Sequence, residues 1–187
     1  MDIRVDGAAV GTQVRAGTED DLEELTRIYN HYVVATPITF DIEPFTVEQR
    51  SPWLASHPGH GPHRLLVAEE GGKVLGYATS SAFRAKPAYS TSVETSVYVA
   101  PEQVGRGVGS LLYTSLFEVL EQEDVRQALA GIALPNEASE RLHLGFGFQP
   151  VGVYREVGRK FGKFWDVAWF QRPISPGPLP GPGQGAG

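Results

Sequence analysis

The sequence predicts a single α/β domain in which a mixed β-sheet is covered by helices. Strand-like and helical segments follow one another along most of the 187 residues, and this length suits one compact domain with its own core. We expect the domain to span residues 13–172. An extension over 1–12 lacks a clear pattern, and the Pro- and Gly-rich tail over 173–187 has too few apolar side chains to be ordered.

Hydrophobic periodicity and turn signals set the order of the elements. A capping pattern at Thr18 and Asp21 predicts where the first helix begins, and Thr46 with Gln49 predicts a second helix that is short, kinked or restarted at Pro52. The remaining expected elements are a first strand at 13–15, a hairpin of strands at 64–69 and 74–82, strands at 93–100, 127–134, 148–156 and 164–171, and helices at 110–121 and 137–144.

Composition and charge exclude several classes of function. A net charge of −6 argues against a nucleic-acid surface, and no apolar run is long enough to span a bilayer. The chain has no cysteine, so disulfides, thiolate metal sites and an acyl-cysteine mechanism are excluded. The N-terminus also lacks a basic segment followed by an apolar run, so we expect a cytoplasmic protein. Three histidines, His57, His60 and His63, fall in a predicted loop without convergent partners, so we expect no metal site.

A glycine-rich segment, Gly105 to Gly109, lies between the strand at 93–100 and the helix at 110–121. Free N–H groups and the helix dipole at such a place favour an anion, and glycines let a phosphate approach the backbone. The alternative is a plain turn. The segment matches neither the dinucleotide fingerprint nor the Walker loop, so a phosphate role depends on the sequence around it.

That surrounding sequence resembles the GCN5-related N-acetyltransferase (GNAT) superfamily, in its phosphinothricin acetyltransferase branch. The resemblance rests on the run from Ser96 to Gly109 and on short matches spread along the chain: Asn30-His31-Tyr32, Thr39-Phe40, Ala88-Tyr89, Glu94 to Val99, Leu134-Pro135-Asn136, Leu142-His143, Gly147-Phe148 and Trp165-Asp166-Val167. Two positions depart from the family pattern. Val104 stands where Gln or Arg is usual, and Phe164 stands where this branch commonly has tryptophan.

The resemblance implies a GNAT fold and acetyl-CoA as cosubstrate. The sheet would have six to seven mostly antiparallel strands, with a V-shaped splay between the strand that carries Glu94 and the strand at 127–134. A homodimer is also implied. The residues expected to bind acetyl-CoA are Val97, Tyr98, Val99, Val104, Gly105, Arg106, Gly107, Val108, Gly109, Ser110, Asn136 and Ser139.

Acyl transfer to an amine needs a base for the ammonium proton and an acid for the leaving thiolate. By strand alternation Glu94, Ser96 and Tyr98 share one face, which is either the wall of a cleft or the solvated face of an edge strand. The resemblance places the base at Glu94. It also gives His143 a catalytic or substrate-polarising role, against the alternative of a histidine packed on a short helix, whereas His31 is interpreted as structural.

The resemblance further implies a small acceptor that carries an α-amine and an acidic group, such as phosphinothricin, methionine sulfone or methionine sulfoximine. Arg84 would bind the acidic group through its bidentate guanidinium, and Phe40, Tyr89 and Glu94 would complete the acceptor site. Two alternatives stay open: a polyamine, an aminoglycoside or a protein N-terminus as acceptor, and a noncatalytic acyl-CoA sensor.

Overall fold

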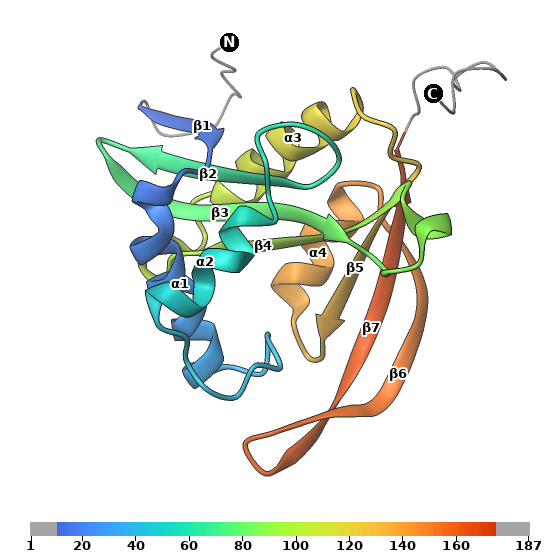
Figure 1. The fold of residues 1–187 in the computed structure, drawn as a ribbon. Coiled ribbons are helices and arrows are strands. Elements are labelled where there is room, and N and C mark those ends of the chain that lie inside the picture. The colour runs from blue at the N-terminus through green and yellow to red at the C-terminus, as the bar shows by residue number, and fades with distance from the viewer. Residues whose placement is uncertain (1–10, 175–187) are drawn as a thin grey trace, which may run out of the picture.

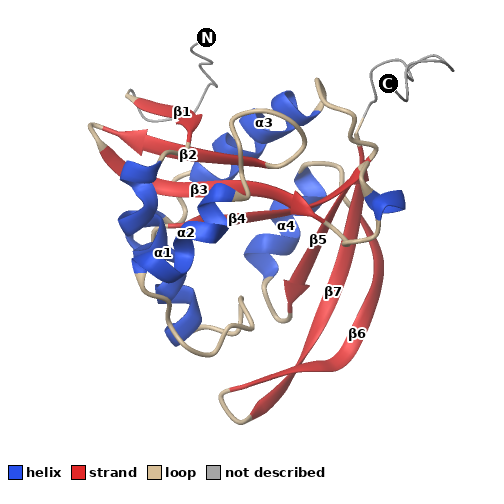
Figure 2. Cartoon of the chain, viewed as in Figure 1, coloured by secondary structure: helices blue, strands red, loops and turns tan. Residues whose placement is uncertain are grey.

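The computed structural model describes residues 11–174, which form one seven-stranded sheet with helices on both faces (Figures 1 and 2). The strand order is β1-β2-β3-β4-β5-β7-β6, and every neighbouring pair is antiparallel except β4 and β5. The sheet confirms the predicted fold class. The main elements are β1 (Thr12–Ala16), α1 (Leu22–Ala35), α2 (Val47–Ala55), β2 (Arg64–Glu70), β3 (Lys73–Ala82), β4 (Ser92–Val99), α3 (Val108–Leu120), β5 (Gln127–Ala133), α4 (Glu137–Gly145), β6 (Gln149–Lys160) and β7 (Lys163–Pro173).

Two hydrophobic clusters fix the helices to opposite faces of the sheet. On one face, Leu25 of α1 packs with Tyr77 of β3, and α2 completes this layer. On the other face, Leu112 of α3 packs with Val93 of β4, and the larger cluster extends to the side of α4. Successive residues of β4 therefore point alternately into one layer and the other, as strand alternation predicts.

The sheet opens between β4 and β5, which is the predicted splay. The two strands pair in parallel only between Ser92–Glu94 and Gln127–Leu129. Beyond these residues β4 runs on to Val99 and β5 to Ala133 without pairing with each other. One edge of β4 is therefore free of strand partners for most of its length, and this opening positions the site described below.

The last hairpin is longer than the sequence predicts. Its strands were expected to end at Glu156 and to resume at Phe164, but β6 and β7 extend until a two-residue turn joins them. The reason is a register shift between Tyr154 and Gly158, where Glu156 adopts a positive φ of 51°. This irregularity interrupts the alternation of apolar and polar residues on which strand prediction depends.

The C-terminal boundary also extends beyond the expected residue 172. Pro173 is the last residue of β7, and Ile174 is only 2% exposed, with its amide 3.0 Å from the carbonyl oxygen of Arg126. The Pro- and Gly-rich composition from residue 173 onward predicted a tail there, because composition reveals neither the place of Pro173 in β7 nor the burial of Ile174. The expected N-terminal extension, apart from the start of β1, and the tail from residue 175 lie outside the described residues.

Candidate active site

The glycine-rich loop ends in a helix start that lacks a side-chain cap. Gly105 and Gly107 have φ values of 85° and 79°, in the left-handed region that favours glycine. Gly107 is the N-cap residue of α3, and the first helix-closing bond runs from the amide of Leu111 to its carbonyl oxygen at 3.0 Å. The amides of the first turn, from Val108 to Ser110, therefore face outward without intrahelical partners, which is the arrangement that binds an anion.

Side-chain contacts hold this loop against the sheet. Arg106 hydrogen-bonds to Gln103 and forms an ion pair with Glu70 at 3.3 Å, so its guanidinium is tied to the end of β2. Val104 is 63% exposed, so the valine at this unusual position adds no packing to the loop. The backbone N–H groups consequently remain the main binding groups that the loop offers.

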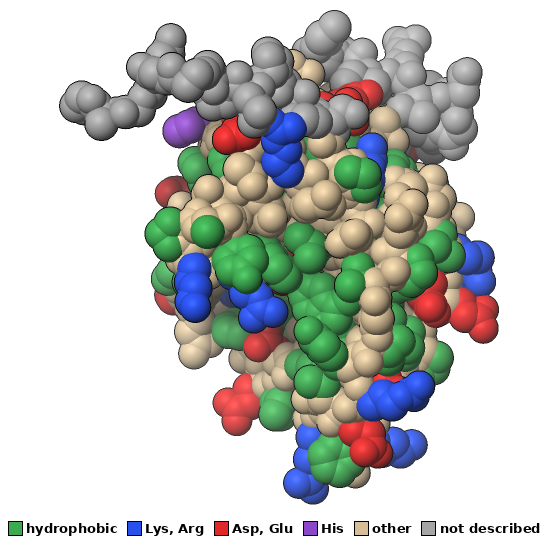
Figure 3. Space-filling model, turned by 90° about the vertical axis from the view of Figure 1, so that its right-hand side faces the viewer, with side chains coloured by type: hydrophobic (Ala, Val, Ile, Leu, Met, Phe, Trp, Pro, Cys, Tyr) green, Lys and Arg blue, Asp and Glu red, His purple; other side chains and the backbone are tan. Residues whose placement is uncertain are grey.

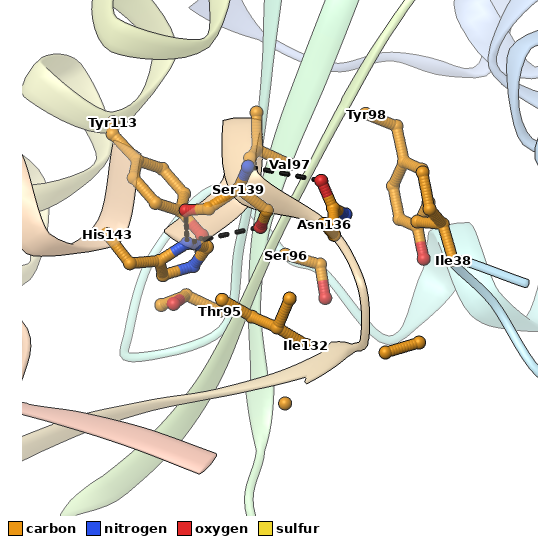
Figure 4. A pocket seen from close by; sticks show the side chains of 12 residues that line it. Ile38, Thr95, Ser96, Val97, Tyr98, Tyr113, Ile132, Asn136, Ser139 and His143 are labelled. Carbon is orange, nitrogen blue, oxygen red and sulfur yellow. Dashed lines mark hydrogen bonds between the residues drawn. The ribbon is translucent and has the colours of Figure 1, made fainter. Parts of the chain in front are cut away.

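A pocket lies in the splay, between the free edge of β4 and the start of α4 (Figure 4). It lies close to the glycine-rich loop, because a Cβ atom on Gly109 would be 3.4 Å from Cδ2 of Leu142 in α4 and 3.9 Å from Cγ2 of Val97 in β4. The residues that line the pocket are Ile38, Thr95, Ser96, Val97, Tyr98, Tyr113, Gly131, Ile132, Ala133, Asn136, Ser139 and His143. The pocket thus brings together five residues that the sequence singled out, namely Val97, Tyr98, Asn136, Ser139 and His143.

Asn136 positions α4 at the edge of this pocket. Its side-chain oxygen accepts a hydrogen bond from the amide of Ser139 at 3.2 Å, which is an N-cap interaction. Because the cap fixes the first turn of α4, it also fixes where Ser139 and His143 point (Figure 4).

His143 is a buried, neutral imidazole in a defined tautomer. It is 3% exposed, with Nδ1 2.7 Å from the carbonyl oxygen of Ser139 and Nε2 2.9 Å from the hydroxyl of Tyr113. Since a carbonyl can only accept, Nδ1 carries the proton and Nε2 accepts from Tyr113. Burial lowers the pKa of His143, and the bond to the Ser139 carbonyl opposes this shift only in part.

Glu94 lies on the other face of β4 from the α3 cluster, next to the pocket residue Thr95. Tyr98, four residues further along β4, faces α1 and stacks on Tyr77, with 5.5 Å between the ring centroids. Because side chains alternate along a strand, Glu94 points to this same face. Burial raises the pKa of the half-buried Glu94 carboxyl group, while the positive charge of Arg84 opposes the rise. Glu94 therefore has the environment of a base, although it does not itself line the pocket.

The three remaining acceptor-site candidates, Arg84, Tyr89 and Phe40, do not line this pocket. Arg84 is exposed just after β3, with its guanidinium carbon 4.9 Å from the ring centroid of Phe83. Tyr89 also contacts the Phe83 ring, at 5.9 Å between centroids. Phe40 lies over Gly158 of β6 so closely that there is no room there for a Cβ atom.

Sequence reasoning missed Tyr113 and Trp169. Tyr113 looks like a core residue of an apolar helix, and nothing in its spacing reveals that its hydroxyl meets His143. Trp169 lies over Gly131, where a Cβ atom would be 3.3 Å from Cζ2 of the indole. A glycine inside a strand is a known sign of such a close approach, so Gly131 was a usable signal.

Within residues 11–174, no helix is long and apolar enough to cross a membrane. The same part of the chain contains no group of three or more His, Asp or Glu side chains placed to hold a metal ion.

The uncapped helix start and the free edge of β4 together suit a phosphate-bearing ligand such as acyl-CoA, and similarity to known proteins identifies the class. Residues 14–169 match the acetyltransferase (GNAT) domain family. The chain is 67% identical over 164 residues to a phosphinothricin N-acetyltransferase of Streptomyces coelicolor, covering 87% of this chain and 96% of that protein. It is 33% identical to a methionine sulfoximine/methionine sulfone acetyltransferase of Salmonella typhimurium, covering 84% and 92% of the two chains.

A solved structure gives the same result. A phosphinothricin acetyltransferase from Sinorhizobium meliloti in complex with acetyl-CoA superposes with a TM-score of 0.86 at 32% identity, covering 94% of this chain and 95% of that one. The chain belongs to the GNAT acetyltransferases. It is an N-acetyltransferase, and its cosubstrate is acetyl-CoA, so the predicted family, enzyme class and cosubstrate are confirmed.

Proposed function

We propose that this enzyme acetylates the primary α-amine of a small, amino-acid-like acceptor by direct attack in a ternary complex. The names of the relatives support phosphinothricin, methionine sulfone or methionine sulfoximine as the type of acceptor. The observation that carries the mechanism is the position of Glu94, a half-buried carboxylate with a raised pKa at the point where β4 and β5 separate.

Acetyl-CoA supplies the thioester carbonyl that the amine attacks. The loop and the free β4 edge fit such a ligand, because the uncapped first turn of α3 suits a pyrophosphate and an unpaired strand edge suits the amides of a pantetheine arm. Open space around Gly105 and Gly107 leaves room for the phosphates. The residues proposed to bind it are Val97, Tyr98, Val99, Val104, Gly105, Arg106, Gly107, Val108, Gly109, Ser110, Asn136 and Ser139.

Glu94 acts as the base that takes the proton from the acceptor's ammonium group. About a tenth of a peptide-type α-amine is neutral at pH 7, but the ammonium group of a free amino acid lies beside its own carboxylate and is a weaker acid, so most acceptor molecules bring a proton that the base has to remove. Because burial raises the pKa of Glu94, the carboxyl group is a stronger base than a solvated glutamate.

His143 contributes the acid step through Tyr113. Both nitrogens of His143 are engaged, and the Tyr113 hydroxyl that donates to Nε2 belongs to a residue that also lines the pocket (Figure 4). The proton that reaches the leaving sulfur is proposed to come from the Tyr113 hydroxyl, which His143 holds in place. Because the resting Nε2 of His143 carries no proton to give, Tyr113 regains its proton from water after CoA leaves.

Arg84 is proposed to bind the acidic group of the acceptor, beside Tyr89 and Phe40. Its charge is felt at Glu94, so a ligand that binds both residues would place its amine near the carboxylate and its acid group near the guanidinium. We expect Arg84→Ala to raise the KM of acidic acceptors about 10-fold, while the KM of acetyl-CoA stays unchanged. A polyamine acceptor would not show this increase, because it has no acidic group.

A thiol-release assay with acetyl-CoA tests the proposed function. The acceptors are phosphinothricin, methionine sulfone, methionine sulfoximine, spermidine, an aminoglycoside and a short peptide. We expect turnover with the first three and a loss of kcat of about 10²–10⁴-fold in Glu94→Gln, with CoA binding by calorimetry unchanged. Turnover of spermidine alone would overturn the acceptor, and an active Glu94→Gln would remove Glu94 from the mechanism.

We also propose that the enzyme works as a cytoplasmic homodimer. Apolar side chains gather on the side formed by the last hairpin (Figure 3), and the exposed ones there are Val151, Val153, Tyr154, Val157, Phe161 and Phe164. A patch of this kind on an edge strand suits association with a second copy. Sedimentation of the wild type and of Val153→Glu tests this, since a dimer formed here dissociates in the variant.

A further inference from the structure

We propose that Ser81 and His57 form a relay that carries the acceptor's proton from Glu94 to the solvent at the end of α2. This inference rests on the proposed function, in which Glu94 takes that proton. It assigns a role in proton transfer to two residues outside the pocket and outside the acceptor site described above.

The β3–β4 ladder places Ser81 beside Glu94. The two residues are direct partners in the antiparallel register, so their side chains project from the same face, with Cβ atoms about 5 Å apart. The next pairs along this face are Thr79 with Ser96 and Tyr77 with Tyr98. Ser81 is therefore the hydroxyl of β3 that faces Glu94.

His57 continues the path from Ser81 away from the sheet. Its Nε2 lies 2.9 Å from Oγ of Ser81, and its Nδ1 lies 2.7 Å from the carbonyl oxygen of Trp53. Because that carbonyl can only accept, Nδ1 carries the proton and Nε2 accepts from the Ser81 hydroxyl. The oxygen of Ser81 is then left with lone pairs that accept a hydrogen bond from a protonated Glu94.

This polarity fits the direction in which a proton has to move. An ammonium group and a thioester become an amide, a thiol and one proton in excess, and that proton must leave Glu94 before the next cycle. The Glu94 carboxylic acid gives its proton to Ser81 as Ser81 passes its own to Nε2 of His57. The imidazolium then loses its Nδ1 proton to water beside the exposed Ser56, and Glu94 is again a carboxylate. The proton left on Nε2 has to return to Nδ1 through solvent before the next cycle, which restores the resting tautomer.

The charges around the relay keep the imidazolium short-lived. Burial lowers the pKa of His57, the hydrogen bond to the Trp53 carbonyl opposes this, and the nearby His63 in the following loop and Arg50 on α2 lower it further. Burial raises the pKa of Glu94, with Arg84 opposing. The two shifts bring the pKa of Glu94, ordinarily the lower of the two, and the pKa of His57, ordinarily the higher, toward each other, so a proton can pass from the carboxyl group without being trapped on the imidazole.

Two variants interrupt the relay with little change in shape. Ser81→Ala removes the connecting hydroxyl, and His57→Gln keeps a hydrogen-bonding group near Ser81 that cannot take up a proton. Thr79→Val is the matched control, because it removes a buried hydroxyl from the same face of β3, opposite Ser96 instead of Glu94. The measurement is kcat in the thiol-release assay at rising concentrations of imidazole buffer.

We expect kcat to fall about 10-fold in Ser81→Ala and in His57→Gln at low buffer concentration, and to recover as imidazole carries the proton instead. The wild type and Thr79→Val should be independent of buffer, and calorimetric binding of CoA should be unchanged in all four proteins. A loss that buffer does not restore, or no loss at all, overturns the relay while leaving the proposed function intact. A wild type without turnover overturns both.

Discussion

Two buried histidines on opposite faces of the sheet share one hydrogen-bonding arrangement. In both His57 and His143, Nδ1 lies 2.7 Å from the carbonyl oxygen four residues earlier, and Nε2 lies 2.9 Å from a hydroxyl, that of Ser81 or Tyr113. A side chain at the end of a helix points back along the helix, so it readily reaches that carbonyl. Local helix geometry therefore sets the same tautomer twice.

The partner hydroxyls give the two histidines different tasks. Tyr113 is wholly buried among the aromatic rings of the α3 and α4 layer and lines the pocket, whereas Ser81 lies on β3 opposite Glu94. In the proposed mechanism one histidine therefore acts next to the leaving sulfur, and the other acts behind the base. The two histidines have the same tautomer, so their proposed roles differ only through the hydroxyl group that each contacts.

Among the variants that test this comparison, Tyr113→Phe should change activity and stability the most. The ring and its packing against Phe117 and Phe148 remain, but His143 Nε2 loses its donor and the pocket loses the hydroxyl proposed as the acid. We expect kcat to fall about 100-fold and the free energy of unfolding to fall by about 1–3 kcal/mol. Steady-state kinetics and urea unfolding measure the two effects.

Tyr77→Phe is the control for that variant. Tyr77 is as deeply buried as Tyr113, but its hydroxyl has no hydrogen-bond partner within the described residues. Removing this hydroxyl should leave kcat unchanged and should not destabilise the fold. If both variants lost kcat equally, the loss would reflect packing, and the acid role of Tyr113 would be contradicted.

The pH dependence of stability should show a smaller effect, and both histidines contribute to it. Burial holds the pKa of each below the unfolded value of about 6.5, so the unfolded chain binds more protons below that pH. The stability that each neutral imidazole provides is fully present above about pH 6.5 and is lost as the pH falls toward the folded pKa. Thermal unfolding should therefore show Tm decreasing from about pH 7 to about pH 5.

Single variants separate the two contributions. His57→Gln and His143→Gln should each flatten this decrease in Tm, and a slope that neither variant changes would show that other groups cause it. Glu94 contributes with the opposite sign, because its raised pKa stabilises the fold at low pH and this stabilisation is lost as pH rises through the folded pKa. Repeating the series in Glu94→Gln removes that contribution.

The sequence predicted most of the fold because its patterns are local. The capping pair Thr46 and Gln49 begins α2 as expected, and α2 is short, with Pro52 inside it, where the proline has no N–H to donate to the carbonyl oxygen of Glu48. The last hairpin could not be predicted in full, because the register shift after Tyr154 depends on pairing with β7. A bulge is a property of two strands, so one strand's periodicity does not reveal it.

The candidate site was less predictable, and the two histidines show why. His143 was singled out by a family resemblance, whereas His57 was assigned to a loop without partners. Each of these histidines has a hydrogen bond to a distant residue: His143 to Tyr113, which is 30 residues away in the chain, and His57 to Ser81, which is 24 residues away. Such contacts depend on how layers pack, and no spacing pattern in a single sequence encodes them.

The smallest expected effects come from two serines that lie beside Nδ1 of the histidines. Ser56 Oγ is 3.2 Å from Nδ1 of His57, and Ser139 Oγ is 3.3 Å from Nδ1 of His143. In both places the carbonyl oxygen at 2.7 Å accepts the hydrogen bond from Nδ1–H, so the serine hydroxyls are secondary partners. Ser56→Ala and Ser139→Ala should each change the free energy of unfolding by less than about 0.5 kcal/mol.

Kinetics should nevertheless separate the two serines. Ser139 lines the pocket proposed for acetyl-CoA, whereas Ser56 is exposed at the end of α2 on the opposite face of the sheet. Ser139→Ala should therefore raise the KM of acetyl-CoA about 2–3-fold, the amount that one weak hydrogen bond provides, and Ser56→Ala should leave it unchanged. An equal rise in the KM of acetyl-CoA in both variants would mean that both histidines affect the same ligand. The proposal that the two histidines act at different places in the reaction would then be contradicted.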